Sequence, residues 1–169
     1  MTLSRLLVAA LLCAFALPAT AGAAKKSNSS SPLTSAAAVG ARYWGAVPCQ
    51  GRIKVLAKQP LAAGVARDTD AWVTFDTPLG ANNLAAPAST YTNCTIAFAR
   101  WRWRTPASMR EDWDMLCATM THELGHLLGH THDLLPGSVM APVFTDFSSV
   151  PRLCKANRPR AARSARRSR

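Results

Sequence analysis

The stretch HELGHLLGHTHD, residues 122–133, contains four histidines, and the chain has no others. A tetrahedral catalytic zinc site uses three protein ligands and keeps its fourth position open for water. His122 and His126 are four residues apart, so on a helix their side chains lie on one face, about 5–6 Å apart. Two imidazoles at that spacing can bind the same ion. The stretch therefore predicts a metal site in which one histidine is not a ligand.

The third ligand follows from where the helix has to end. In a continuous helix His122 and His130 would lie about 12 Å apart along the axis, too far to share one ion. Gly129 is suited to the left-handed conformation that ends a helix. After such a turn His132 can reach back to the metal. We therefore predict that His122, His126 and His132 bind one catalytic zinc ion and that His130 does not.

Glu123 follows the first predicted ligand and supplies a carboxylate beside the metal. In the H-E-x-x-H arrangement this glutamate is the general base that activates a zinc-bound water. It can then pass the proton to the leaving amine of a cleaved peptide bond. The predicted chemistry is hydrolysis of peptide bonds, with Glu123 as the catalytic residue.

The longer pattern H-E-x-x-H-x-x-G-x-x-H, followed by Met140 in SVMAP (138–142), resembles the metzincin zinc endopeptidases. The sequence around Met140 is most similar to that of the matrixin branch. The resemblance implies an α+β fold, namely a zincin catalytic domain with a twisted mixed sheet, an active-site helix and a small C-terminal subdomain. It also implies that Met140 lies under the zinc without binding it.

The same resemblance implies where a substrate binds. Pro142, Val143 and Phe144 would form the wall of the specificity pocket, and Ala118 would line it and leave room for a bulky apolar side chain. The segment CTIAFA (94–99) would be the edge strand against which an extended peptide pairs. Protein or peptide substrates are therefore expected.

The chain departs from the matrixin pattern at Asp133, where these enzymes usually carry serine. An aspartate ligand, Asp133 or Asp146, stays open as an alternative third ligand. A glutamate ligand downstream is excluded, because the chain has only Glu111 and Glu123. No histidine outside the motif is left for a structural zinc site, and nine acidic residues do not favour calcium sites.

A non-enzymatic alternative is a zinc-holding module that binds peptides or anionic envelope polymers. It would use His130 as a fourth ligand, with a basic tail as an additional contact. A closed structural site has no use for a base beside an open coordination position, so Glu123 favours the enzyme.

The N-terminus predicts export. Arg5 precedes the apolar run 6–17, and residues 21–23 form a small-residue cleavage site, as in a secretory signal peptide spanning residues 1–23. The mature chain would be extracellular, with no transmembrane anchor. The Ala/Arg-rich composition and the short signal favour a bacterial origin.

Removal of the signal leaves four cysteines, an even number that predicts two disulfides in an exported protein. These are Cys49, Cys94, Cys117 and Cys154. Three pairings are possible, and we expect Cys94–Cys117 with Cys49–Cys154. The first pair would connect a strand to the helix that follows it.

The charge pattern suggests a single domain between a linker and a tail. The net charge of +11 falls to +1 for residues 27–154, once ten cations at the two ends are removed. We predict a flexible linker at 24–41, a catalytic domain at 42–154 and a disordered basic tail at 155–169. The tail could contact anionic polymers. A monomer without specific nucleic-acid binding is expected.

Alternation and turn residues predict strands at 51–57, 71–76 and 94–101, with a loop at 77–93. The helix with the histidines is predicted to begin at a capping box formed by Ser108 and Glu111. Its apolar stripe should pack on the core while His122 and His126 face a cleft. The stripe consists of Met109, Trp113, Leu116, Cys117, Met120, Leu124 and Leu127.

Overall fold

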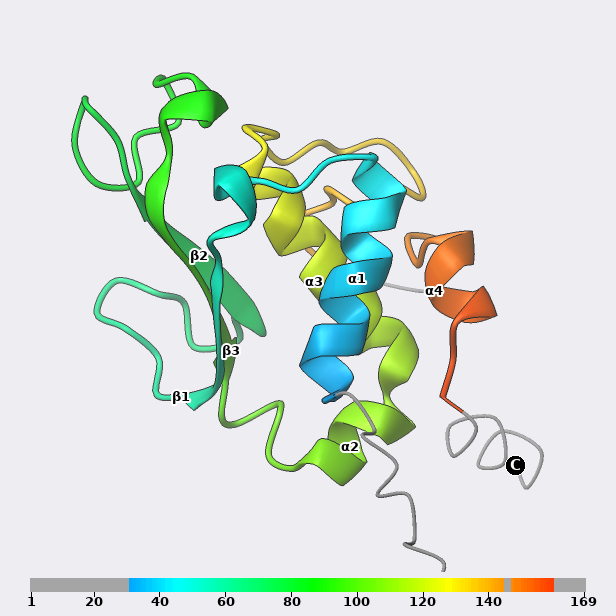
Figure 1. Ribbon diagram of the computed structural model, residues 1–169. Coiled ribbons are helices and arrows are strands. Elements are labelled where there is room, and N and C mark those ends of the chain that lie inside the picture. Colours follow the sequence, from blue (N-terminus) through cyan, green and yellow to red (C-terminus); the bar gives the residue numbers. More distant parts are fainter. Residues whose placement is uncertain (1–30, 145–146, 160–169) are drawn as a thin grey trace, which may run out of the picture.

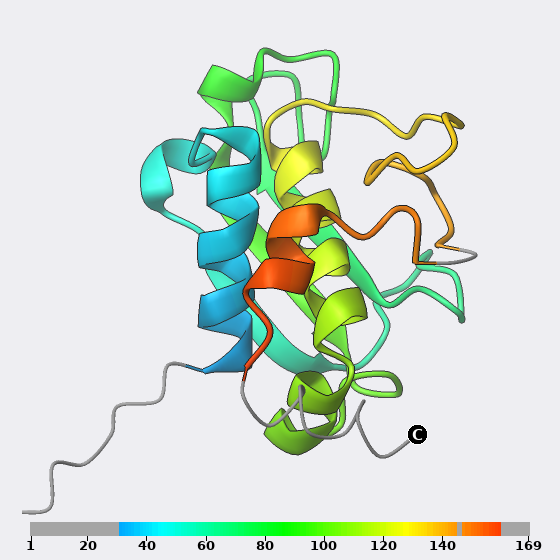
Figure 2. The ribbon, with the colours of Figure 1, turned by 90° about the vertical axis from the view of Figure 1, so that its right-hand side faces the viewer.

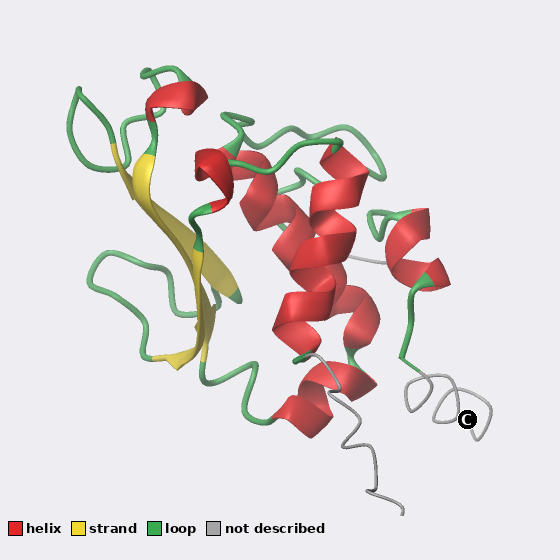
Figure 3. Ribbon diagram, in the orientation of Figure 1, coloured by secondary structure: helices red, strands yellow, loops and turns green. Residues whose placement is uncertain are grey.

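A computed structural model describes residues 31–144 and 147–159. Helices and a small sheet form separate layers (Figure 1, Figure 3). The α-helices are α1 (Pro32–Trp44), α2 (Pro106–Glu111), α3 (Trp113–Leu127) and α4 (Arg152–Ala156). The strands are β1 (Lys54–Gln59), β2 (Ala71–Asp76) and β3 (Thr92–Ala99), with short 3-10 helices η1 (Cys49–Gly51) and η2 (Ala88–Thr90).

The sheet is mixed and has the order β1-β3-β2. β3 pairs with β1 in parallel and with β2 in antiparallel orientation. The prediction that residues 94–99 form the edge strand is therefore wrong, because β3 has a partner on each side. β2 matches the predicted strand 71–76, whereas β1 and β3 are shifted by a few residues from the predicted 51–57 and 94–101. The mixture of helices with a mixed sheet agrees with the predicted α+β class.

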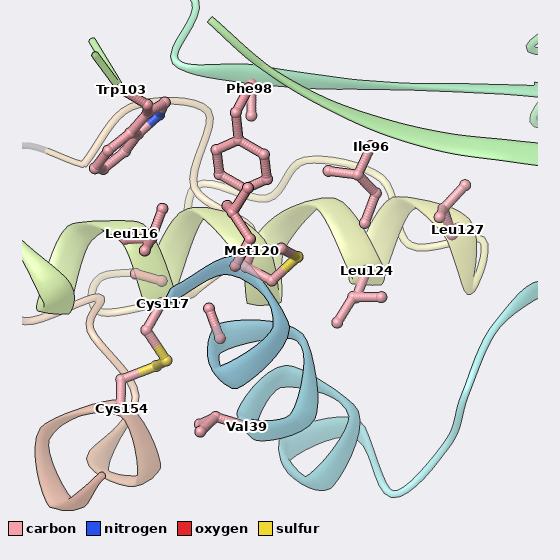
Figure 4. Packing of buried hydrophobic residues seen from close by; sticks show 14 of the residues in the cluster. Val39, Ile96, Phe98, Trp103, Leu116, Cys117, Met120, Leu124, Leu127 and Cys154 are labelled. Atoms are coloured by element: carbon pink, nitrogen blue, oxygen red, sulfur yellow. A yellow bond between two sulfur atoms is a disulfide. The ribbon is translucent and has the colours of Figure 1, made fainter. Parts of the chain in front are cut away.

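α3 lies between the sheet on one side and the helices α1 and α4 on the other (Figure 1, Figure 2). Its predicted apolar stripe is buried throughout. Figure 4 shows Phe98 and Ile96 from β3 facing one side of α3, and Val39 from α1 lying on the other. Fully buried Trp103 closes the same core near Phe98. The core therefore fixes α3 from two opposite directions.

α1 occupies most of the segment that the sequence predicts to be a linker, so that prediction is wrong from residue 32 onward. Ser31 caps the helix by accepting a hydrogen bond from the Thr34 backbone N–H at 3.1 Å. Gly45 ends it in the left-handed conformation, with φ of 64°. Leu33, Ala36 and Val39 recur on one face and are buried. Because the segment is rich in Ser and Ala, this weak amphipathic pattern is difficult to recognise in the sequence.

The predicted capping box at Ser108 and Glu111 is also wrong. Thr105 is the N-cap of α2, and its side chain accepts a hydrogen bond from the Ser108 backbone N–H at 3.0 Å. Ser108 completes the box by accepting from the Thr105 backbone N–H. Asp112 then leaves helical geometry, with φ of −100° and ψ of 41°, and separates α2 from α3.

All four predicted cysteines form disulfides, but the expected pairing is wrong. Cys49 pairs with Cys94, which connects η1 to β3, and Cys117 pairs with Cys154. The second disulfide joins α3 to α4 (Figure 4). Cys94 and Cys117 do not pair with each other, because Cys94 is bonded to Cys49 and Cys117 to Cys154.

The folded part extends into the predicted tail. Lys155 belongs to α4 and donates to the Phe147 carbonyl at 3.0 Å, and Arg158 forms an ion pair with Asp114. The prediction of disorder is wrong for 155–159, since these residues pack on α3 and the preceding loop. The predicted signal peptide, residues 24–30, Asp146 and the remainder of the tail lie outside the described residues. None of the described helices combines the length and the hydrophobicity that a membrane-spanning helix requires.

Candidate metal centre

The end of α3 carries two of the predicted ligands, and the chain then turns to bring in the third. α3 ends at Leu127, and Gly129 adopts a left-handed φ of 89°, as the sequence predicts. The turn is closed by the His130 N–H, which donates to the Gly125 carbonyl at 3.0 Å. His132 follows this turn and faces back toward α3.

The Nε2 atoms of the three predicted ligands converge. His122 and His126 place these atoms 3.0 Å apart, and each lies 3.2 Å from Nε2 of His132. Three nitrogens bound to one tetrahedral zinc at 2.0–2.1 Å would be separated by about 3.3 Å. The observed triangle therefore fits a zinc ion. His130 lies outside it, with its ring stacked on Trp44 at 4.4 Å between centroids.

Backbone carbonyls determine which ring nitrogen of each helical histidine carries hydrogen. Nδ1 of His122 lies 2.8 Å from the Val139 carbonyl, and Nδ1 of His126 lies 2.9 Å from the His130 carbonyl. A carbonyl only accepts hydrogen bonds, so each Nδ1 is the donor. Burial lowers the pKa of His122 to about 4 and also lowers the pKa of His126. Both imidazoles are therefore neutral near pH 7, with a free Nε2 lone pair aimed at the shared point.

Asp133 connects the third ligand to the segment around Met140. Its backbone N–H donates to the Met140 carbonyl at 3.1 Å, and its carboxylate accepts from the Ser138 hydroxyl at 2.8 Å. The Leu135 backbone N–H also donates to this carboxylate, at 3.0 Å. Each carboxylate oxygen of Asp133 thus accepts one hydrogen bond from within the loop. The group of converging metal-binding side chains found in the described residues contains only histidines.

Met140 lies directly against the helix that carries His122 and His126. A Cβ atom added to Gly125 would lie 2.5 Å from the Met140 sulfur, so only glycine allows this close approach. Met140 itself is 3% exposed. Met140 is therefore buried against α3, and its role under a metal ion stays a prediction.

Glu123 lines the same cleft as the three histidines and is 5% exposed. Burial raises the pKa of its carboxyl to about 8. Within the described residues no cationic side chain pairs with it. A cation bound by the neighbouring histidines would favour its ionised form.

The cleft has a volume of about 620 Å³. Its lining includes Ala71, Val73 and Phe75 from β2 and three residues predicted for the specificity pocket, Pro142, Val143 and Phe144. Phe144 meets His122 edge to face, with ring centroids 5.8 Å apart. The cleft is therefore mainly apolar around the metal-binding side chains.

Ala118 does not line the cleft, which corrects the prediction for this residue. It is fully buried in the core and is not among the residues that line the cleft, although it lies one helical turn before His122. The lining residues on the preceding turns are Met115 and Thr119, which lie seven and three residues before His122. Helical spacing from His122 places both residues on its side of α3, but it does not distinguish them from Ala118.

Comparison with known proteins gives a family and no individual relative. The matrixin family model matches residues 63–155, which include β2, β3, α3 and every residue of the histidine triangle. No curated protein matched the chain, and no solved structure matched it.

Proposed function

Because the chain belongs to the matrixin family, whose members are zinc metalloproteases, we propose that it is a secreted zinc-dependent endopeptidase. The observation that carries the proposal is the triangle of Nε2 atoms, with edges of 3.0–3.2 Å, beside the buried carboxyl of Glu123 in one cleft. A purely structural metal site would not need such a carboxyl next to an accessible cleft.

The proposed ligands are His122, His126 and His132. A zinc ion held there would polarise the carbonyl of the scissile peptide bond and make a water molecule more acidic. His122 and His126 contribute neutral Nε2 lone pairs because their Nδ1 hydrogens are held by backbone carbonyls.

Glu123 would accept the proton from the attacking water and deliver it to the leaving amine nitrogen. Glu123 is 5% exposed and lines the cleft, so its carboxyl lies at the place where this proton transfer is proposed. This role requires the ionised carboxylate at the start of the reaction, which a nearby cation stabilises.

β2 offers the binding edge for an extended peptide. Within the described residues β3 is its only strand partner, and on its other edge Asn82 is hydrogen-bonded to the backbone N–H and carbonyl of Phe75, so a peptide would pair with the residues of β2 that precede Phe75. A substrate could add to this edge through backbone hydrogen bonds and place alternate side chains in apolar pockets. Met115, Thr119 and Phe144 would then contact the side chain that follows the scissile bond.

The two disulfides support the extracellular part of the proposal. Cysteine pairs of this kind form and persist in oxidising compartments. The mass of the protein recovered from the medium of an expressing culture tests this point. Loss of residues 1–23 is expected, and retention of the whole chain inside the cells would contradict secretion.

The activity is tested with a broad library of quenched peptides and the mature, oxidised protein. We expect cleavage that stops on addition of a zinc chelator and returns with added zinc. Glu123→Ala should bind zinc and cut nothing. If wild type binds zinc but cleaves no peptide, and Glu123→Ala behaves identically, the non-catalytic zinc-binding module replaces the enzyme.

A further inference from the structure

Trp44, the last residue of α1, contacts α3 at the two positions that directly precede the helical histidines. Its indole N–H donates to the Thr121 carbonyl at 2.8 Å. A Cβ atom added to Gly125 would lie only 2.8 Å from Cζ2 of the same indole. In Figure 1 and Figure 2 the C-terminal end of α1 lies beside the C-terminal end of α3. The indole therefore spans one turn of the helix that carries His122 and His126.

The same indole also holds the histidine that is not a ligand. The His130 ring stacks on Trp44 with centroids 4.4 Å apart and planes inclined by 19°. Although His130 is an exposed residue, its main chain is fixed on both sides. Its N–H donates to the Gly125 carbonyl at 3.0 Å, and its carbonyl accepts from Nδ1 of His126 at 2.9 Å.

These contacts form a continuous path from α1 to a predicted metal ligand. The path runs from the Trp44 indole to the His130 ring, and from the His130 carbonyl to the imidazole of His126. We propose that Trp44 is a positioning residue for the zinc site and acts through His130. The inference rests on the proposed zinc site, and it assigns a role to α1, which lies outside the matched residues 63–155.

The physical reason is the hydrogen bond at Nδ1 of His126. Such a bond fixes the tautomer and the orientation of a metal-binding imidazole, and its loss typically weakens metal binding about 10-fold to 100-fold. Without the stacking contact, the position of the His130 carbonyl is less restricted. The ring of His126 would then lose its fixed direction although no ligand has been removed.

A purely structural role for Trp44 makes a different prediction. In that case its replacement would lower the stability of the fold as any buried α1 side chain does, and a folded variant would bind zinc normally. Val39 is the matched control, because it lies in the same helix, is 3% exposed and packs on the core.

The experiment measures zinc affinity by competition with a chromogenic chelator in the full-length mature protein. Trp44→Leu and His130→Ala should each weaken binding about 10-fold or more. Trp44→Phe and His130→Phe keep an aromatic ring at the stack and should retain most of the affinity. Val39→Ala should lower the thermal midpoint and leave the affinity unchanged.

The double variant Trp44→Leu/His130→Ala shows whether the two residues act together. If Trp44 acts through His130, the double variant loses no more affinity than the weaker-binding single variant. Additive losses would overturn the path through His130. The visible absorption spectrum of the Co²⁺-substituted protein gives a second readout, and it should change in Trp44→Leu but not in Val39→Ala.

Wild-type protein that does not bind zinc would overturn the proposed function and this inference together. Wild type that binds zinc, with folded Trp44→Leu showing the same affinity and the same Co²⁺ spectrum, would overturn the inference alone.

Discussion

The two ends of α3 are held in different ways. At its N-terminal end the Cys117–Cys154 disulfide joins the helix to α4, and the Trp113 indole donates to the Cys154 carbonyl at 2.8 Å. Asp114, which is 5% exposed, forms an ion pair with Arg158 at the same contact. These interactions are a covalent bond, a hydrogen bond and an ion pair, and none of their residues lines the cleft.

The C-terminal end carries the histidines and has only non-covalent support. The Val139 carbonyl accepts from His122, the His130 carbonyl accepts from His126, and Trp44 and Met140 pack against the helix. These supporting groups come from segments far apart in the sequence. The comparison suggests different roles for the two ends of α3. Contacts at the N-terminal end hold the helix in the fold, and contacts at the C-terminal end orient the side chains of the predicted ligands.

The largest expected effect is at the ligand end. His132→Ala removes one of the three converging Nε2 atoms and should abolish both stoichiometric zinc binding and peptide cleavage. His130→Ala keeps all three ligands and should retain a measurable zinc affinity and cleavage. Zinc content after dialysis and peptide turnover check both. Equal loss of zinc in the two variants would contradict the three-histidine site.

At the opposite end, removal of the Cys117–Cys154 disulfide should act on stability. The double variant Cys117→Ser/Cys154→Ser should lose about 2–5 kcal/mol of unfolding free energy, because the cross-link no longer restricts the unfolded chain. Denaturant titration measures this loss. Cys49→Ser/Cys94→Ser is the matched control, since it removes a disulfide that does not touch α3.

Zinc affinity of the folded Cys117→Ser/Cys154→Ser protein should stay close to that of wild type. An affinity loss as large as that expected for Trp44→Leu would show that the two ends of α3 are coupled. It would contradict the proposal that they have separate roles.

A smaller effect is expected from the ion pair at this end. Arg158→Ala removes a charged donor from the nearly buried Asp114 and should cost about 1–3 kcal/mol of unfolding free energy. Arg152→Ala, at an exposed position of α4, is the control and should change little. Thermal and denaturant unfolding check the difference. Identical stabilities of the two variants would show that the pair contributes nothing measurable.

The zinc-free protein should also show a pH dependence of its stability. Burial raises the pKa of Glu123 to about 8 from an ordinary 4.5, so between these values the unfolded chain releases a proton that the folded chain keeps. The contribution of Glu123 to the free energy of unfolding is therefore present at low pH and is lost as pH rises toward 8. Glu123→Gln lacks this titration. Its thermal midpoint relative to wild type, measured in chelator, should be more favourable at pH 8 than at pH 5.

His122 has the opposite dependence, because its pKa is lowered to about 4 and its contribution is lost as pH falls below 6.5. Both proteins contain His122, so its effect cancels in the comparison. A difference between wild type and Glu123→Gln that is the same at pH 5 and pH 8 would contradict the raised pKa of Glu123.

The sequence predicted the local features of the ligand end well. Helical spacing paired His122 with His126, and Gly129 indicated the turn that brings in His132. These features depend on residues close together in the chain, for which the geometry of a helix and its end is sufficient. The matrixin resemblance added Met140, which the structure places against Gly125.

Long-range features were predicted poorly. The disulfide pairing depends on which elements become neighbours, and the composition of α1 masked the helix that supplies Trp44. The strand 71–76 was recognised, but alternation alone does not tell an edge strand from a central one. Ser31 before Pro32, together with Gly45, was the signal that could have revealed α1, since these residues mark its two ends.

The most direct test of the central claim compares zinc-loaded wild type with zinc-loaded Glu123→Gln on one peptide selected from the library. Glutamine keeps the size of the side chain and cannot accept the proton. We predict equal zinc content, one ion per chain, and a turnover reduced about 100-fold to 10,000-fold in the variant. Equal turnover in the two proteins at equal zinc content would contradict the assignment of Glu123 as the base of a zinc endopeptidase.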